Sequence, residues 1–144
     1  MATYKNFEDL EVWKLSREYC KEIYDIIDTT PLKNSWKLRD QIDGASGSIM
    51  DNIAEGFERG GTKEFIQFLG FSKGSCGETR SQLYRIYDRR FIDEELFKKL
   101  INKSNQISKQ LNGFITYLKQ TGIKGYKFEE DQEVYITKDK SENN

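Results

Sequence analysis

The sequence of 144 residues contains no histidine, one proline and two cysteines. Without histidine, the chain can form neither a Ser-His-Asp nor a Cys-His catalytic group. The Glu-x-x-His pairs that build di-iron sites in helical bundles are excluded for the same reason. Cys20 and Cys76 lie in apolar helical stripes and lack a CxxC spacing, which indicates reduced core residues of a cytoplasmic protein. We therefore expect no catalytic residue, no metal site and no cofactor.

Long apolar runs are also missing. No segment approaches the length of about 18 apolar residues that spans a membrane, and no basic-then-apolar leader is present. The sequence therefore predicts neither a membrane span nor a secretory signal, and a cytoplasmic location is expected. The 23 basic and 24 acidic side chains give a net charge of −1, so the composition provides no global attraction to nucleic acid.

Glycine is frequent where helices are expected. Five glycines fall inside segments with helical apolar spacing: Gly44, Gly47, Gly70, Gly74 and Gly77. Each costs about 1 kcal/mol relative to alanine in a helix interior. The sum is comparable to the whole stability of a small domain. We therefore expect neighbouring helices to approach closely at these glycines, with the second and third helices closest at their small residues.

Apolar periodicity predicts four helices. The first runs from Asp9 to about Asp28 and carries two apolar rows, a face broad enough for more than one neighbour. The second begins after an N-cap at Asn34 or Ser35 and ends near Glu58. The third follows a turn at residues 59–62 and keeps two heptad series, Phe65-Ser72-Thr79-Ile86 and Leu69-Cys76-Leu83. The fourth begins with Asp93 as N-cap and runs to Gly122.

Short connections between long helices imply antiparallel neighbours. The predicted fold is all-α: an antiparallel, up-down-up-down four-helix bundle over residues 1–122. Residues 123–144 form a charged tail without helical period, expected to be partly extended or disordered. Its apolar residues could dock on this subunit or on the next: Tyr126, Phe128, Val134, Tyr135 and Ile136.

Three motifs carry a resemblance to a known family. They are FEDLEVWKLS at residues 7–16, a QI…SIxxNIAEG pattern at residues 41–56, and EFIQFLGFSKGSCGE at residues 64–78. Over residues 5–120 the chain resembles the four-helix bundle proteins encoded in intervening sequences of bacterial 23S ribosomal RNA genes. That fold is shared with accessory proteins of diversity-generating retroelements, which form rings of five, bind nucleic acid through a basic surface and associate with a reverse transcriptase.

The resemblance implies a homopentamer that binds RNA or a nucleic-acid-processing protein. The chain departs from the accessory proteins because its bundle is nearly neutral where theirs is basic. It also carries Arg90-Phe91-Ile92 where a Gly-aromatic-Ile turn is usual. A left-handed Arg90 would cost about 1 kcal/mol relative to glycine.

A polar row lies beside the apolar row of the second helix: Gln41, Ser48, Asn52 and Glu55. Asn52 and Glu55 could together perform acid–base chemistry. No second carboxylate, histidine or metal-ligand set accompanies them, so a structural polar seam that fixes helix register is favoured. The turn at residues 59–63 could cradle a phosphate, but it lacks the P-loop spacing, and a flexible turn capped by Thr62 is preferred.

Seven basic residues are the candidates for RNA contact: Lys73, Arg80, Arg85, Arg89, Arg90, Lys98 and Lys99. Lys73 and Arg80 are one heptad apart, and the others gather near the turn between the third and fourth helices. Acidic residues share that region, so a solvated face is the competing interpretation: Glu78, Asp88, Asp93, Glu94 and Glu95. The predicted function is a non-enzymatic, self-assembling scaffold that binds RNA or a nucleic-acid-processing partner. The alternative is a protein–protein adaptor with no affinity for nucleic acid.

Overall fold

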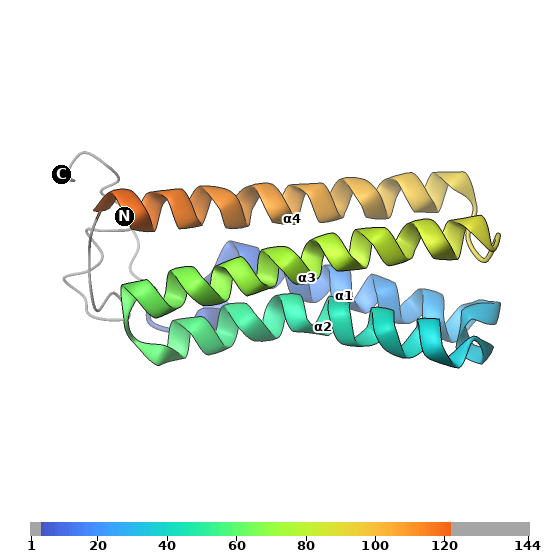
Figure 1. The fold of residues 1–144 in the computed structure, drawn as a ribbon, viewed down its shortest axis with the longest axis horizontal. Coiled ribbons are helices and arrows are strands. Elements are labelled where there is room, and N and C mark those ends of the chain that lie inside the picture. Colours follow the sequence, from blue (N-terminus) through green and yellow to red (C-terminus); the bar gives the residue numbers. More distant parts are fainter. Residues whose placement is uncertain (1–3, 122–144) are drawn as a thin grey trace.

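The computed structural model describes residues 4–121, and within them it confirms four long helices (Figure 1). The predictions for the tail, residues 123–144, lie outside the described residues. The helices are α1 (Glu11–Thr29), α2 (Trp36–Arg59), α3 (Thr62–Asp88) and α4 (Glu94–Thr121), with short 3-10 helices η1 (Phe7–Asp9) and η2 (Pro31–Asn34). The sequence pattern did not indicate the two 3-10 helices.

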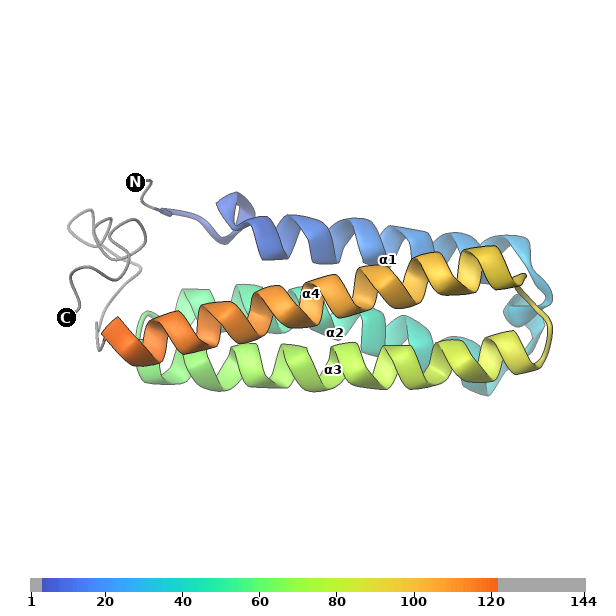
Figure 2. The same ribbon diagram turned by 90° about the horizontal axis from the view of Figure 1, so that it is seen from above.

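The helices run up, down, up and down, as predicted, and surround one core. In the two perpendicular views, α2 packs between α1 and α3, while α4 packs on α3 and α1 (Figures 1 and 2). Helices α2 and α4 therefore occupy opposite corners of the bundle.

Local chemistry explains where the helices begin and end. The Asp93 carboxylate accepts a hydrogen bond from the Leu96 backbone N–H at 2.9 Å, so Asp93 is the N-cap of α4, as predicted. Helix α2 ends at Arg59, and its C-cap is Gly60, which has φ +85°, a conformation that glycine adopts without steric cost. Thr62 is the first residue of α3 and Gly61 is its N-cap. The expected capping role of Thr62 was therefore wrong, by one position.

The heptad series of α3 lies in the core. All seven of its residues are buried: Phe65, Leu69, Ser72, Cys76, Thr79, Leu83 and Ile86. One of the two apolar rows predicted for α1 is buried throughout: Val12, Ser16, Tyr19, Ile23 and Ile26. The other row, which includes Trp13, Tyr24 and Ile27, is buried only in part, since Tyr24 is 56% exposed. Helix α1 contacts both α2 and α4, in agreement with its predicted broad face.

The expectation of close packing at the five glycines was wrong. A Cβ atom added at Gly44, Gly47, Gly70 or Gly74 would meet nothing within 4 Å, because these glycines lie on the outward sides of α2 and α3. A Cβ at Gly77 would meet only the end of the Arg80 side chain, at 3.6 Å. The helical period of a sequence shows which residues lie on the same side of a helix. It does not show which of two sides made of polar or small residues faces a neighbouring helix.

The close approach of α2 and α3 occurs instead at Gly56. A Cβ there would lie 2.5 Å from the Phe68 Cβ and 3.1 Å from the Phe65 Cδ1. Small residues do bring the two helices together further along, since the Ser72 hydroxyl donates to the Ile49 carbonyl of α2 at 2.6 Å. Among the described residues, no helix is long and apolar enough to cross a bilayer.

Candidate nucleic-acid interface

The turn between α3 and α4 holds its arginines on a well-defined backbone. Arg90 has φ 63°, and among the described residues it is the only one other than glycine that has a positive φ. The Arg90 N–H donates to the Tyr87 carbonyl at 2.8 Å, and the Phe91 N–H donates to the Ile86 carbonyl at 3.2 Å. These two bonds define a Schellman motif, with arginine where glycine is usual. The left-handed conformation considered for Arg90 is confirmed.

The seven candidate basic residues differ in what they contact. The Arg80 guanidinium reaches across to α4 and donates to the Ser104 hydroxyl at 3.3 Å. Arg85 donates to the Gln41 side chain at 3.1 Å. Lys98 pairs with Glu94 at 2.9 Å. These three cations are therefore engaged within the chain.

The remaining four divide into two groups. Lys99 lies 3.8 Å from Glu22 of α1, a carboxylate that also pairs with Lys103 at 3.1 Å. Lys73, Arg89 and Arg90 are exposed, and none of the three forms an ion pair within residues 4–121. Arg89 and Arg90 lie at the end of the bundle, whereas Lys73 lies more than four helical turns earlier on α3. The structure thus gives a cationic turn and a separate lysine, and the seven residues do not form one continuous patch.

The polar row on α2 borders its contact with α3. Gln41 and Glu55 are exposed, while Ser48 and Asn52 are half-buried. The Asn52 amide donates to the Ser48 carbonyl at 2.8 Å, Gln41 accepts from Arg85, and Glu55 pairs with Arg59 at 3.1 Å. The row therefore bonds to its own helix and to Arg85 of α3.

A buried polar cluster joins α3 to α4 in the middle of the bundle, and the sequence pattern did not reveal it. The Cys76 thiol lies 3.2 Å from both the carbonyl and the hydroxyl of Ser104. Burial raises the pKa of the Cys76 thiol. The Tyr19 hydroxyl of α1 is buried beside this cluster, without a hydrogen-bond partner among the described atoms, and burial raises its pKa. Burial therefore keeps both groups protonated near neutral pH.

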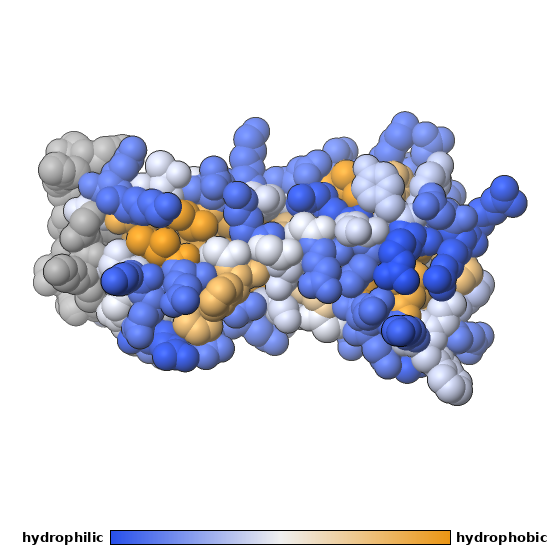
Figure 3. Space-filling view, in the orientation of Figure 1, coloured by the Kyte–Doolittle hydropathy of each residue, from blue (hydrophilic) through white to orange (hydrophobic). Residues whose placement is uncertain are grey.

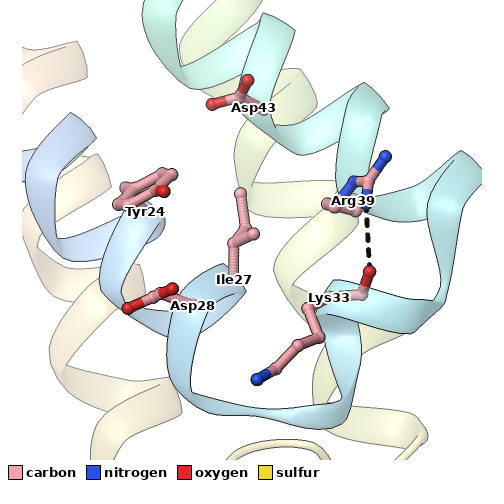
Figure 4. A pocket seen from close by; sticks show the side chains of 6 residues that line it. All are labelled: Tyr24, Ile27, Asp28, Lys33, Arg39 and Asp43. Carbon is pink, nitrogen blue, oxygen red and sulfur yellow. Dashed lines mark hydrogen bonds between the residues drawn. The ribbon is translucent and has the colours of Figure 1, made fainter.

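Cys20 is free and half-buried, whereas Cys76 is free and fully buried. The Cys20 thiol lies 3.9 Å from the Ser46 hydroxyl of α2. Within the described ranges, no three histidine, cysteine or acidic side chains lie close enough together to hold a metal ion. A small pocket of about 300 Å³ lies between α1, η2 and α2 (Figure 4).

Surface charge is unevenly divided between the two halves of the bundle. Residues 4–59, which include α1 and α2, carry 8 basic and 12 acidic side chains, a net charge of −4. Residues 62–121, which include α3 and α4, carry 11 basic and 6 acidic side chains, a net charge of +5. Because the helix pairs occupy different sides, the near-neutral total conceals an acidic α1–α2 side and a basic α3–α4 side.

The fold places the chain among small, all-α, antiparallel four-helix bundle proteins. Residues 8–113 match the model of the 23S rRNA-intervening sequence protein family. The chain belongs to this family, which confirms the resemblance carried by its three motifs.

A solved structure agrees with this assignment. The chain is similar to a protein of unknown function from the S23 ribosomal protein family of Bacteroides thetaiotaomicron, with 26% sequence identity and a TM-score of 0.66. The alignment covers 72% of this chain and 97% of that one. Comparison with curated proteins finds no match.

Proposed function

We propose that this protein is a non-enzymatic, self-assembling scaffold that binds RNA through the α3–α4 turn, at the end of its basic α3–α4 side. The observation that carries the proposal is the charge division, with a net +5 on residues 62–121 against −4 on residues 4–59. A basic side attracts phosphates even when the whole chain is nearly neutral, because the local potential governs the encounter. The family name, which refers to ribosomal RNA genes, supports RNA as the ligand.

The α3–α4 turn supplies the strongest candidate contacts. Arg89 and Arg90 are exposed, and their backbone is held by the Schellman hydrogen bonds. The planar guanidinium group binds a phosphate through two parallel hydrogen bonds, which lysine cannot do. Contacts to phosphate give affinity without base specificity, so we expect binding of structured RNA with little sequence preference.

Self-assembly is the second part of the proposal. Exposed aromatic side chains on several helices support it, since aromatic residues are enriched at protein interfaces: Tyr24, Trp36, Phe71 and Tyr84. A homopentamer is the expected stoichiometry, on the strength of the family resemblance. The two free thiols support a reducing, cytoplasmic location, where ribosomal RNA is processed.

The RNA proposal is tested by measuring binding to a structured RNA at low and moderate salt. Binding through phosphates weakens steeply with salt. The double variant Arg89→Ala/Arg90→Gly should bind more weakly and show a shallower salt dependence. Glycine is used at position 90 because it keeps the left-handed conformation, so that a loss of binding does not reflect a strained turn.

A matched control removes two positive charges from the acidic side. Lys14 and Lys21 of α1 are exposed and pair only with Glu11 and Glu18 of their own helix. Lys14→Ala/Lys21→Ala should therefore leave RNA binding unchanged. If the wild-type protein fails to bind RNA at low salt, the proposal is wrong and the adaptor without nucleic-acid affinity replaces it.

A further inference from the structure

Helices α1 and α2 each carry five acidic and three basic side chains, and on α2 the acidic ones form an uninterrupted stretch. Between residues 40 and 58 this helix carries five acidic side chains and no basic one: Asp40, Asp43, Asp51, Glu55 and Glu58. Asp43 and Asp51 are exposed and form no ion pair within the described part of the chain. Close to them, Gly44 leaves open space on the outward side of the helix, so another chain can approach the α2 backbone.

The opposite corner of the bundle carries the opposite charge. From residue 96 to residue 121, α4 has five lysines and no acidic residue. Lys109 and Lys119 are exposed and form no ion pair with any described residue. Apolar side chains also gather on α3 and α4 toward the end of the bundle where α4 ends (Figure 3). The charged stretches of α2 and α4 are each about 30 Å long, at 1.5 Å per residue.

A pocket on the acidic side is suited to a cationic side chain. It is lined by Tyr24, Ile27 and Asp28 of α1, by Lys33 of η2, and by Arg39 and Asp43 of α2 (Figure 4). The Arg39 guanidinium is engaged by the Asp40 carboxylate at 2.9 Å and by the Lys33 carbonyl at 3.1 Å. It therefore leaves the carboxylates of Asp28 and Asp43 available at opposite ends of the pocket, with Ile27 between them, and Lys33 as the remaining cation of the lining (Figure 4). Each carboxylate attracts an ammonium or guanidinium group through charge, and the exposed ring of Tyr24 adds a cation–π interaction.

An exposed tryptophan lies next to this pocket. Trp36 is 69% exposed, and it shares a helix face with Arg39 and Asp43 because they follow it by three and seven residues. Tryptophan, tyrosine and arginine are the residues that most often dominate the energy of a protein interface. The α1–α2 side thus combines aromatic anchors with unpaired carboxylates.

We propose that the α1–α2 side of one copy receives the α3–α4 side of a second copy, with a lysine of α4 entering the pocket between Tyr24, Asp28 and Asp43. This inference rests on the self-assembly proposed above and identifies the two surfaces involved. The surfaces are different and lie on different sides of the bundle, so the contact is heterologous. A repeated heterologous contact closes into a ring when its rotation permits, and otherwise forms an open filament.

Reciprocal charge reversal tests this interface. The basic variant Asp28→Lys/Asp43→Lys reverses the charge at the pocket and brings residues 4–59 from a net charge of −4 to 0. The acidic variant Lys109→Glu/Lys119→Glu reverses two charges on α4 and brings residues 62–121 from +5 to +1. Each variant alone should lose assembly and give the mass of one chain, 16.9 kDa, by light scattering. In an equimolar mixture the mass should rise above that of one chain again, because a contact between unlike variants pairs opposite charges at the substituted positions. A ring of five would keep one contact between like variants, so the expected result is this rise in mass and not a closed pentamer.

The control is Lys14→Glu/Lys21→Glu, which changes the net charge by the same amount as Lys109→Glu/Lys119→Glu. Its two new negative charges lie on the α1–α2 side, which is already acidic. It should assemble like the wild type. Circular dichroism of every variant verifies that the helices form, which is expected because all substituted side chains are exposed. Assembly also buries Trp36, so tryptophan emission should move to shorter wavelength in the wild type and in the mixture.

Three results would overturn the inference. They are a wild-type protein that stays at 16.9 kDa in low salt, charge-reversed variants that assemble normally, and a mixture that fails to recover assembly. None of the four substituted interface residues belongs to the Arg89 and Arg90 pair used in the RNA test. Failure of this interface with RNA binding intact, or the reverse, therefore separates the two proposals.

Discussion

The inner and outer sides of α2 and α3 carry the same residue type for opposite reasons. Gly56 faces α3, and a Cβ there would overlap the Phe68 Cβ at 2.5 Å. Gly44, Gly70 and Gly74 face outward, where a Cβ would meet nothing within 4 Å. Glycine is thus required at one position for packing and costs stability at the others. A glycine in a helical sequence lacks a side chain, but the sequence does not show whether a neighbouring helix packs against it. Only the surroundings of the glycine in the structure show this.

The largest expected effect is at the inner glycine. Gly56→Ala should lower the free energy of unfolding by about 2 to 3 kcal/mol. The added methyl group would overlap the Cβ of Phe68, which is bonded to the backbone and cannot move aside by rotation of the side chain. Chemical denaturation at neutral pH measures this change. A stability equal to or above that of the wild type would show that α2 and α3 are not in close contact at Gly56.

The outer glycines should respond in the opposite direction. Gly44→Ala and Gly74→Ala should each raise the free energy of unfolding by about 1 kcal/mol, because alanine has the higher helix propensity and meets no neighbour. The same denaturation experiment applies, in dilute protein where chains are separate. Destabilisation by either substitution would contradict the outward placement of these residues.

The turn after α3 offers a comparison with the turn after α2, which already has glycine at its left-handed position. Arg90→Gly should raise the free energy of unfolding by about 1 kcal/mol, since it removes the strain of an arginine with φ 63°. Arg89→Gly, at a neighbouring residue with φ −86°, is the matched control and should give no gain. Equal effects of the two substitutions would argue against the Schellman geometry.

The smallest expected effect lies in the buried polar cluster and depends on pH. Burial raises the pKa of Tyr19 above its ordinary value near 10. The stabilising contribution of the neutral hydroxyl is therefore complete below about pH 10 and is lost above it, because the unfolded chain ionises first. Tyr19→Phe removes this loss.

Tyr19→Phe should leave stability at pH 7 within a few tenths of a kcal/mol of the wild type, because the hydroxyl lacks a hydrogen-bond partner. At about pH 10.5 the variant should be more stable than the wild type by about 0.8 kcal/mol. Parallel denaturation curves at the two pH values provide the measurement. Identical pH dependence of the two proteins would indicate that the Tyr19 hydroxyl reaches solvent.

Much of the fold could be predicted because its signals are local. The heptads of α3 and the N-cap at Asp93 depend on residues close in sequence, and the structure bears them out, whereas the cap of α3 is Gly61 and not Thr62. The other failures involve residues distant in sequence. The contacts of Arg80 with Ser104 and of Lys103 with Glu22 join separate helices, and no period within one helix indicates them.

The candidate site was harder to predict for a related reason. The total charge of −1 suggested a neutral surface, yet the sum hides two sides of opposite sign. Seven basic residues were grouped by sequence proximity, but the structure engages Arg80, Arg85 and Lys98 within the chain. Exposure and pairing depend on the neighbours that the fold supplies, so the cationic turn at Arg89 and Arg90 could be separated from the rest only in three dimensions.

The sequence by itself determined that this protein is a four-helix bundle of the 23S rRNA-intervening sequence protein family, because helix periodicity, caps and family motifs are written along the chain. The tertiary structure alone decided which glycine lies between helices, which cations remain exposed, and how acidic and basic sides are separated. Those properties arise from contacts between helices that are distant in sequence, and they exist only once the helices have packed against one another.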